Sequence, residues 1–424
     1  DRTNSDVARR GQMRTLDKEV HMHSRNNSRF ALVPLAMGSA IALAACSAGA
    51  GDSNSSESSE GEVVKIGFIG ALTGGSASLN VPIEQGLQLA AAELNESGEL
   101  DGRTIELVVE DDQADATRSA QAAERLVSEE GVIAVIGGGN SATVAANNPI
   151  ITGSGVVQLI SVAQTDPLVD PESPGFPLTF RVTENNSYDV GAIAGLFEDG
   201  AYDHICAVAD TTEYGQSGLE TIRAVFEERG LELQDVAQHD VGATDMTPQV
   251  LSLRDAGCDA VYLFSLGADA AVFMKGVNQA GWDVPVIGGR GLNQGAFLSI
   301  AGDGADGIIM PSTTDPENPR GVEFAEAFDA EYGPDADPGH VFSALGFDTL
   351  QILVAALQDS GWEGGEALAA SLETIEHEGA AGREGSSYSY TADDHEGPGE
   401  DFLVFVRIED GAYVLETRDV TSGN

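Results

Sequence analysis

The chain has 424 residues, 42% of them hydrophobic, and its 69 Asp and Glu against 21 Lys and Arg give a formal net charge of −48. This length suffices for two domains of ordinary size, each with its own core. Such a charge argues against nucleic acid as a partner and against docking on an anionic membrane through a basic patch. The acids are scattered over the whole chain, which indicates a solvated acidic surface.

The N-terminal segment has the pattern of an exported lipoprotein. Residues 1–21 show no apolar periodicity and do not begin with Met, so they are interpreted as an extension outside the leader. Residues 22–45 join a basic start to an apolar run too short to span a bilayer, as in a signal peptide. The run ends in Leu43-Ala44-Ala45-Cys46, which resembles the bacterial lipobox and predicts lipidation of Cys46. The alternative is a simple signal peptide with a chance cysteine.

Residues 46–62 are rich in Ser, Gly and Glu, so they predict a flexible tether with a reach on the order of 20 Å. We therefore expect an extracytoplasmic protein anchored by lipid to the outer face of the cell membrane. The other two cysteines, Cys206 and Cys258, lie at apolar, strand-like runs. A disulfide is possible in an exported protein, but Cys206 lies inside its strand whereas Cys258 precedes one. Two buried free thiols are therefore favoured.

From residue 63, short β-branched runs alternate with longer amphipathic segments. Strands are predicted at 63–69, 104–110, 132–136 and 156–160, and helices at 81–96, at 114–129 and from about Ser141. The strands are continuous apolar runs, which is typical of buried parallel strands. The repeated β-α order predicts right-handed crossovers and a doubly wound sheet with helices on both faces.

The same order restarts after Phe180-Arg181-Val182. Strands are predicted at 205–209, 232–237, 260–264, 285–287 and 307–310, and helices at 188–198, 218–229, 248–256, 269–280, 322–332 and 341–360. A final hairpin is predicted at 402–408 and 412–416. The predicted fold class is α/β, with two lobes in tandem. Because open α/β sheets bind ligands beyond the carboxyl ends of their strands, the expected site is the cleft between the lobes.

Two loops at strand ends carry polar groups. Gly137-Gly138-Gly139-Asn140-Ser141 lets the backbone approach a ligand, and Ser141 opens a helix whose free N–H groups favour an anion. The loop at 160–165 places the hydroxyl of Thr165 and an exposed carbonyl at the same rim. From the residues alone, Ser141 is equally a helix cap and Thr165 a turn residue. Neither loop fits a nucleotide signature, so no cofactor is expected.

Catalytic and metal motifs are incomplete. His377-Glu378 lacks the second His of a zinc helix, and Gly215-Gln216-Ser217-Gly218 is one residue short of a nucleophile elbow. Asp393-Asp394-His395-Glu396 lacks the spacing of a calcium loop and is interpreted as a solvated turn. We therefore predict no catalytic residue and no metal site.

Taken in order, the motifs of residues 63–416 resemble the type I periplasmic binding proteins of ABC importers, in the leucine/isoleucine/valine-binding branch. They include Lys65-Ile66-Gly67, Gly70-x-Leu72-Thr73-Gly74, Gly102-Arg103, Val135-Ile136-Gly137, Phe180-Arg181 and Tyr214-Gly215. The resemblance implies two Rossmann-like lobes joined by three hinge crossovers, near Val182, Pro311 and Gly399. It assigns residues 63–182 and 314–398 to lobe 1, and 183–313 and 399–424 to lobe 2.

The resemblance also implies roles for single residues. Ser141 and Thr165, with nearby backbone amides, would hold the α-carboxylate of the ligand. The carbonyl of Ala163 would receive its amine, and Tyr214 would close over it. Because the first loop is one residue longer than the family pattern, Ala142 or Thr143 could take the place of Ser141.

Three positions depart from the family pattern. Leu79 and Leu266 stand where relatives carry ligand-contacting tyrosines, and Arg290 stands where an acid pairs with the ligand's ammonium. An arginine would repel an ammonium, so the ligand would lack a free amine or carry a second acidic group. The alternative is that an acid such as Asp269 or Glu213 holds Arg290 away from the ligand.

The resemblance implies a monomeric solute-binding lipoprotein. It would capture a small amino-acid-like or carboxylate ligand and deliver it to an ABC permease by closure of the lobes. The alternatives are the sensing lobe of a signalling system and, less favoured, a surface hydrolase.

Overall fold

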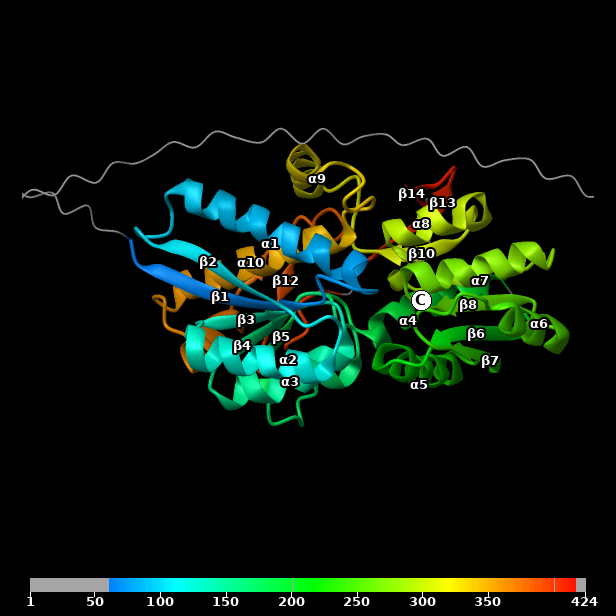
Figure 1. Cartoon of the computed structure of the whole chain (residues 1–424), viewed down its shortest axis with the longest axis horizontal. Helices are drawn as coiled ribbons and strands as arrows, with labels where there is room; N and C mark the ends of the chain where they lie inside the picture. Colours follow the sequence, from blue (N-terminus) through cyan, green and yellow to red (C-terminus); the bar gives the residue numbers. More distant parts are fainter. Residues whose placement is uncertain (1–60, 201, 400, 417–424) are drawn as a thin grey trace, which may run out of the picture. The chain divides into compact units, whose positions relative to one another are not determined.

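The computed structural model describes residues 61–200, 202–399 and 401–416. The predicted leader, Cys46 and nearly all of the tether lie outside these residues. The described chain is built on two large sheets, each the centre of one α/β lobe (Figure 1). The predicted fold class, two doubly wound lobes with parallel strands, is confirmed.

The sheet of lobe 1 is parallel, with strand order β2-β1-β3-β4-β5. Its strands are β1 (Val63–Gly70), β2 (Thr104–Asp111), β3 (Ala134–Gly137), β4 (Val157–Ile160) and β5 (Thr179–Arg181). Helices α1 (Ala77–Ser97) and α10 (Val341–Asp359) cover one face, and α2 (Ala116–Arg125) and α3 (Ser141–Gly153) cover the other (Figure 1). Because successive side chains of a strand point to opposite faces of the sheet, Phe68 packs in the core under α1 and α10, and Ile69 packs in the core under α2.

Helices α1 and α10 cross closely enough to need glycine. A Cβ on Gly86 would lie 2.0 Å from the carbonyl oxygen of Ser343, and one on Gly346 would lie 2.3 Å from that of Ile83. Helix α10 is also long and apolar enough to cross a bilayer, but most of its residues are buried in the core of lobe 1. Its composition is therefore that of a core helix.

The rest of lobe 1 comes from the C-terminal part of the chain. It comprises α9 (Pro319–Tyr332), α11 (Gly365–Leu372) and a small hairpin of β11 (Glu376–His377) and β12 (Tyr388–Ser389). Phe328, Leu368 and Tyr388 from these elements join the same core as Phe68. The sequence pattern predicted α9 but missed α11 and this hairpin.

The sheet of lobe 2 has strand order β14-β13-β10-β9-β8-β6-β7. Its strands are β6 (Ile205–Asp210), β7 (Leu233–His239), β8 (Ala260–Phe264), β9 (Val286–Gly288), β10 (Ile309–Ser312), β13 (Val404–Glu409) and β14 (Ala412–Leu415). In the described part of this sheet, only the pairs β10–β13 and β13–β14 are antiparallel. The predicted C-terminal hairpin thus extends this sheet.

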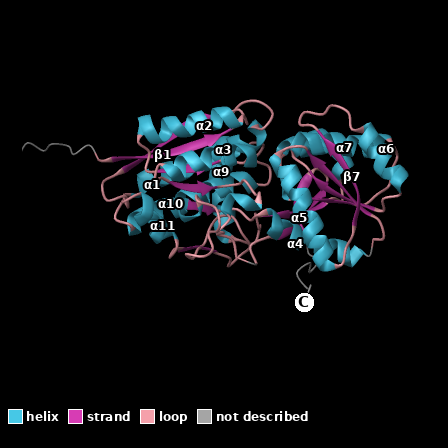
Figure 2. Ribbon diagram, turned by 90° about the horizontal axis from the view of Figure 1, so that it is seen from below, coloured by secondary structure: helices cyan, strands magenta, loops and turns pink. Residues whose placement is uncertain are grey.

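Helices cover both faces of the second sheet as well (Figure 2). Helices α4 (Asn186–Gly200) and α5 (Glu213–Arg229) pack on one face. Helices α6 (Thr247–Ala256), α7 (Gly267–Gln279) and α8 (Gly295–Ala301) pack on the other. The sequence pattern predicted all of these except the short α8.

Residues 391–397, here called the hinge strap, run along the edge of the first sheet. His395 is 1% exposed, and its ring stacks between Phe176 and Phe180 at centroid distances of 4.1 and 3.9 Å. The backbone N–H of Arg181 donates to the carbonyl of His395 (2.9 Å), and that of Gly397 donates to the carbonyl of Arg181 (2.9 Å). The predicted solvated turn is confirmed for the exposed Asp393 and Asp394 and was wrong for His395. A charged sequence does not reveal that two aromatic rings will enclose its histidine.

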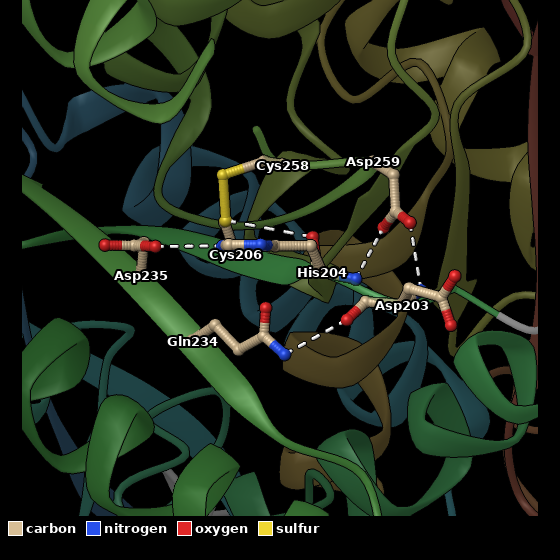
Figure 3. Close-up of a disulfide and its surroundings, with 7 residues drawn as sticks. All are labelled: Asp203, His204, Cys206, Gln234, Asp235, Cys258 and Asp259. Carbon is tan, nitrogen blue, oxygen red and sulfur yellow. Dashed lines mark hydrogen bonds and ion pairs between the residues drawn. A yellow bond between two sulfur atoms is a disulfide. The ribbon is translucent and has the colours of Figure 1, made fainter. Parts of the chain in front are cut away.

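Cys206 and Cys258 form a disulfide (Figure 3), so the prediction of two free thiols was wrong. Strands β6 and β8 are neighbours, with Ile205 opposite Ala260. The N–H of Asp259 donates to the carbonyl of His204 (3.1 Å) and extends this register, which leaves the two cysteine Cα atoms 5.9 Å apart. The sequence pattern does not reveal that β7 lies on the far side of β6 and leaves β6 beside β8. Both sulfurs lie near His204, but sulfurs in a disulfide are not thiolate ligands for a metal.

Candidate functional site

A cavity of about 380 Å³ lies between the two lobes. Lobe 1 lines it with the loop after β1, the first turn of α1, the loop that enters α3 and the segment after β4. Lobe 2 lines it with the segments that follow β6, β7, β8 and β9. These segments meet there because the carboxyl ends of parallel strands share one edge of each sheet.

The loop that enters α3 is held by side chains of lobe 1. The N–H of Gly139 donates to Oδ1 of Asn80 (2.8 Å), and Nδ2 of Asn80 donates to Oδ1 of Asn140 (2.9 Å). Ser141 and Thr143 both line the cavity, but Thr143 donates its hydroxyl to the carbonyl of Asn140 (3.0 Å). Oγ of Ser141 is buried and has no hydrogen-bond partner within the described chain. Of the two hydroxyls, that of Ser141 is the one available to a ligand.

Ala163 and Thr165 lie behind the wall of the cavity, which Val162 and Gln164 line instead. Arg181 donates from Nη1 to the carbonyl of Ala163 (3.1 Å) and from Nη2 to that of Thr165 (3.0 Å). The carbonyl that was predicted to receive a ligand amine is therefore already occupied by a guanidinium.

The remaining predicted residues of lobe 2 line the cavity. The ring of Tyr214 stacks on Phe264 at a centroid distance of 4.4 Å, and its hydroxyl has no hydrogen-bond partner among the residues described. Burial raises the pKa of Tyr214, so this hydroxyl stays protonated and can donate. Leu266, with Leu79 of lobe 1, adds apolar surface.

Arg290 follows β9, is 1% exposed and lines the cavity. Its Nε is ion-paired with Oε1 of Glu184, and its Nη2 donates to the carbonyl of Val162 (3.1 Å). Nη1 has no hydrogen-bond partner in the part of the chain that the structure describes. The alternative that a neighbouring acid holds Arg290 is correct in kind, but the acid is Glu184 and not Asp269 or Glu213, and Arg290 still lines the cavity.

Glu184 belongs to a buried polar group at the first crossover. Its Oε1 accepts from Nε2 of Gln164 (2.9 Å), and its Oε2 accepts from the hydroxyl of Thr183 (2.8 Å). Burial, together with the nearby Glu184, raises the pKa of the neighbouring Asp189 to about 7, and Arg290 opposes the shift. The charge of Arg290 is therefore balanced by Glu184, while Asp189 is partly protonated at pH 7.

Three further residues at the cleft were not predicted. Asp210 ends β6 and lines the cavity; its Oδ1 accepts from the N–H of Thr212 (2.8 Å), and its Oδ2 has no described partner. Ser78 donates to Oε1 of Gln294 across the cleft (3.1 Å). The position of Asp210 at a strand end is a signal that could have identified it. Ser78 and Gln294 carried no such signal, because their contact depends on how the lobes meet.

The comparisons with known proteins agree with this architecture. The family described as periplasmic binding protein matches residues 63–412. The chain is 24% identical over 332 residues to the leucine-, isoleucine-, valine-, threonine- and alanine-binding protein of Pseudomonas aeruginosa, covering 77% of this chain and 87% of that relative. It is 27% identical over 302 residues to Leu/Ile/Val-binding protein homolog 2 of Brucella abortus, covering 70% and 79%.

Solved structures show the same fold. The substrate-binding protein LivJ of Streptococcus pneumoniae, in complex with isoleucine, superposes with a TM-score of 0.73 at 23% identity, covering 84% of this chain and 100% of that one. A solute-binding protein of Rhodopseudomonas palustris, in complex with benzoate, gives a TM-score of 0.74 at 21% identity, covering 83% and 95%. The chain belongs to the periplasmic binding protein family.

Proposed function

We propose that this protein captures a small amino-acid-like or carboxylate ligand in the interlobe cavity and delivers it to an ABC importer, without chemical turnover. The observation that carries the proposal is a cavity walled by both lobes and lined by Ser141, Tyr214 and Arg290, each of which has a buried side-chain donor with no described partner. Buried donors of this kind are costly unless an acceptor meets them, and a ligand supplies one. The names of the relatives and solved neighbours support a captured solute of this size.

A thermal-shift screen of the purified chain tests the proposal. A ligand that binds only the folded protein stabilises it by about 2.7 kcal/mol at a concentration of 100 times Kd, and so raises Tm. We expect one chemical class among amino acids, oxo acids, dicarboxylates and small amides to do so. The Ser141→Ala variant should lose most of the shift while keeping the Tm of the free protein. If no compound in the panel shifts Tm, capture of such solutes is contradicted.

We further propose that the captured ligand is handled by a monomeric protein anchored through a lipid on Cys46. The lipobox-like Leu43-Ala44-Ala45-Cys46 and the Ser- and Gly-rich segment after it support the anchor. Expression of the full chain should place it in the membrane fraction, and Cys46→Ser should release it to the soluble fraction. Equal partition of the two forms would contradict lipid anchoring.

A further inference from the structure

Among the buried atoms of cavity-lining residues that have neither a hydrogen-bond nor an ion-pair partner in the described chain, three can donate a hydrogen bond and one, a carboxylate oxygen, accepts. Ser141 Oγ, Tyr214 Oη and Arg290 Nη1 are buried and have no partner among the described residues. Among the acceptors, Oδ2 of Asp210 is also buried and has no partner in the described residues. A ligand that brings several acceptors satisfies all three donors at once.

Three acceptors near Arg290 that would suit an ammonium are already occupied by protein cations. The carbonyl of Val162 and the carboxylate of Glu184 both accept from Arg290. The carbonyl of Ala163 accepts from Arg181 (3.1 Å). Arg290 thus supplies the positive charge of this part of the cleft, and a ligand ammonium beside it would be repelled.

Two acids of lobe 2 remain as rivals for an amine. Both carboxylate oxygens of Asp269 accept from the N–H of Gly242 (3.1 and 3.0 Å), and the side chain is partly exposed. Oδ1 of Asp210 accepts from the N–H of Thr212, whereas its Oδ2 has no described partner. Because of this oxygen Asp210 is the stronger rival, although burial raises its pKa and so favours the neutral carboxyl, and the test below includes an amine to probe it.

The rest of the wall is apolar. Leu79, Leu266 and Phe342 line the cavity, and Cζ of Arg290 lies 5.5 Å from the centre of the Phe342 ring. This surface favours an aliphatic or aromatic body on the ligand. It also lowers the local polarity around Arg290, which strengthens a charge-assisted hydrogen bond from Nη1.

We infer that the ligand is a 2-oxo acid with an apolar side chain, whose oxygens accept from Ser141, Tyr214 and Arg290. A 2-oxo acid carries three oxygen acceptors and no donor at neutral pH, which matches the donor-rich wall, whereas a 2-amino acid brings an ammonium to the arginine. This inference rests on the proposed capture of a solute in the same cavity and names its chemical class.

Two probes of one carbon skeleton test the inference on the purified chain by titration calorimetry. 4-Methyl-2-oxopentanoate and leucine differ only in the group at C2. We expect the oxo acid to bind at least about 30-fold more tightly, because a site built around buried polar groups discriminates strongly against a mismatched substituent. This comparison uses the unaltered protein and depends on no variant.

A double variant then identifies the residue responsible. R290Q/E184Q removes both charges together, so that neither is left buried and unpaired. We expect it to weaken binding of the oxo acid at least about 10-fold. The matched control is R320Q/E378Q, which removes a surface pair with side chains 58% and 64% exposed and should leave affinity unchanged.

The outcomes separate the two proposals. Tighter binding of the oxo acid that R290Q/E184Q abolishes supports the inference. If leucine binds more tightly than the oxo acid, or if R290Q/E184Q keeps the affinity for the oxo acid, the inference is overturned while capture of a solute stands. If neither probe nor any member of the screening panel binds, both proposals fail.

Discussion

Two arginines of this molecule are buried beside an acidic partner, but their remaining donors differ in whether the protein uses them. Arg181, at the hinge strap, is 0% exposed, pairs with Glu396 (3.0 Å) and donates to the carbonyls of Ala163 and Thr165. Arg290, at the cleft, is 1% exposed and pairs with Glu184, but it keeps Nη1 without a described partner and lines a cavity. Burial and an acidic partner are common to both; the unused donor and the cavity belong only to Arg290.

The difference separates stability from recognition. A buried guanidinium whose groups are used by the fold organises the backbone around it, as Arg181 does for the segment at 163–166. A buried guanidinium that lines a cavity and has an unpartnered donor can form a further hydrogen bond with a ligand in that cavity. Removing Arg181 should therefore damage the fold, whereas neutralising Arg290 with its partner should damage binding.

The largest expected effect is on the hinge strap. Arg181→Gln leaves Glu396 without its cation and removes donors from several carbonyls, so we expect the free energy of unfolding to fall by about 3–5 kcal/mol. Urea unfolding of the ligand-free chain measures this. The control Arg229→Gln removes an exposed pair with Glu198 and should change stability by less than about 0.5 kcal/mol. If Arg181→Gln has the same urea midpoint as the wild-type protein, the structural role assigned to Arg181 is contradicted.

The disulfide between Cys206 and Cys258 is expected to contribute to the stability of lobe 2 and not to ligand binding. Cys206 lies near the start of β6, whereas Asp210 at the end of that strand lines the cavity. C206S/C258S frees a loop with a sequence separation of 52, and we expect a loss of about 2–4 kcal/mol in unfolding free energy with ligand affinity unchanged. Wild-type protein treated with dithiothreitol should match the variant. A fall in affinity would show that this end of the lobe also shapes the cleft.

Asp189 reports on the cleft arginine through pH. Burial raises its pKa in the folded protein to about 7 from the ordinary 3.8, so the folded state holds a proton that the unfolded state has released between about pH 4 and 7. Its contribution to stability is present below pH 4 and is lost as pH rises toward 7. Asp189→Asn should flatten the pH profile in this window by at most about 1.4 kcal/mol per pH unit.

Urea unfolding at a series of pH values measures the Asp189 effect. The exposed Asp335→Asn is the control and should leave the profile as it is. A profile that Asp189→Asn leaves equally steep would mean that burial and Glu184 do not keep Asp189 protonated in this pH range.

The smallest expected effect isolates one hydroxyl. Tyr214→Phe removes a group with no described partner, so stability should hold while affinity for 4-methyl-2-oxopentanoate falls about 5- to 10-fold, the worth of one hydrogen bond. Tyr262 is the matched control, because its hydroxyl is also buried without a described partner and it does not line the cavity. Equal losses in Tyr214→Phe and Tyr262→Phe, measured by calorimetry, would assign the effect to packing.

The periodic pattern of the sequence predicted most strands and the long helices, because buried parallel strands such as β1 and β8 are uninterrupted apolar runs. It missed α8 and α11, whose seven and eight residues leave little room for a period to show. The loop around Ser141 was placed at the cleft by its glycines and its position at a strand end. Glu184 could not be predicted as the partner of Arg290, nor Cys206 as that of Cys258, because each pair depends on the order of strands or on the meeting of two lobes.

The lobes also touch directly, through Ser78 and Gln294 (3.1 Å) and through Thr221 and Asp166 (2.9 Å). If closure of the lobes accompanies the proposed capture, such bonds raise the fraction of ligand-free protein that has the closed shape. A larger fraction improves sensitivity, since the apparent Kd is the intrinsic Kd divided by that fraction. On the proposed role in import, it would also present ligand-free protein to the transporter. The strength of these few polar contacts would then balance sensitivity to a scarce solute against engagement of the transporter by ligand-free protein.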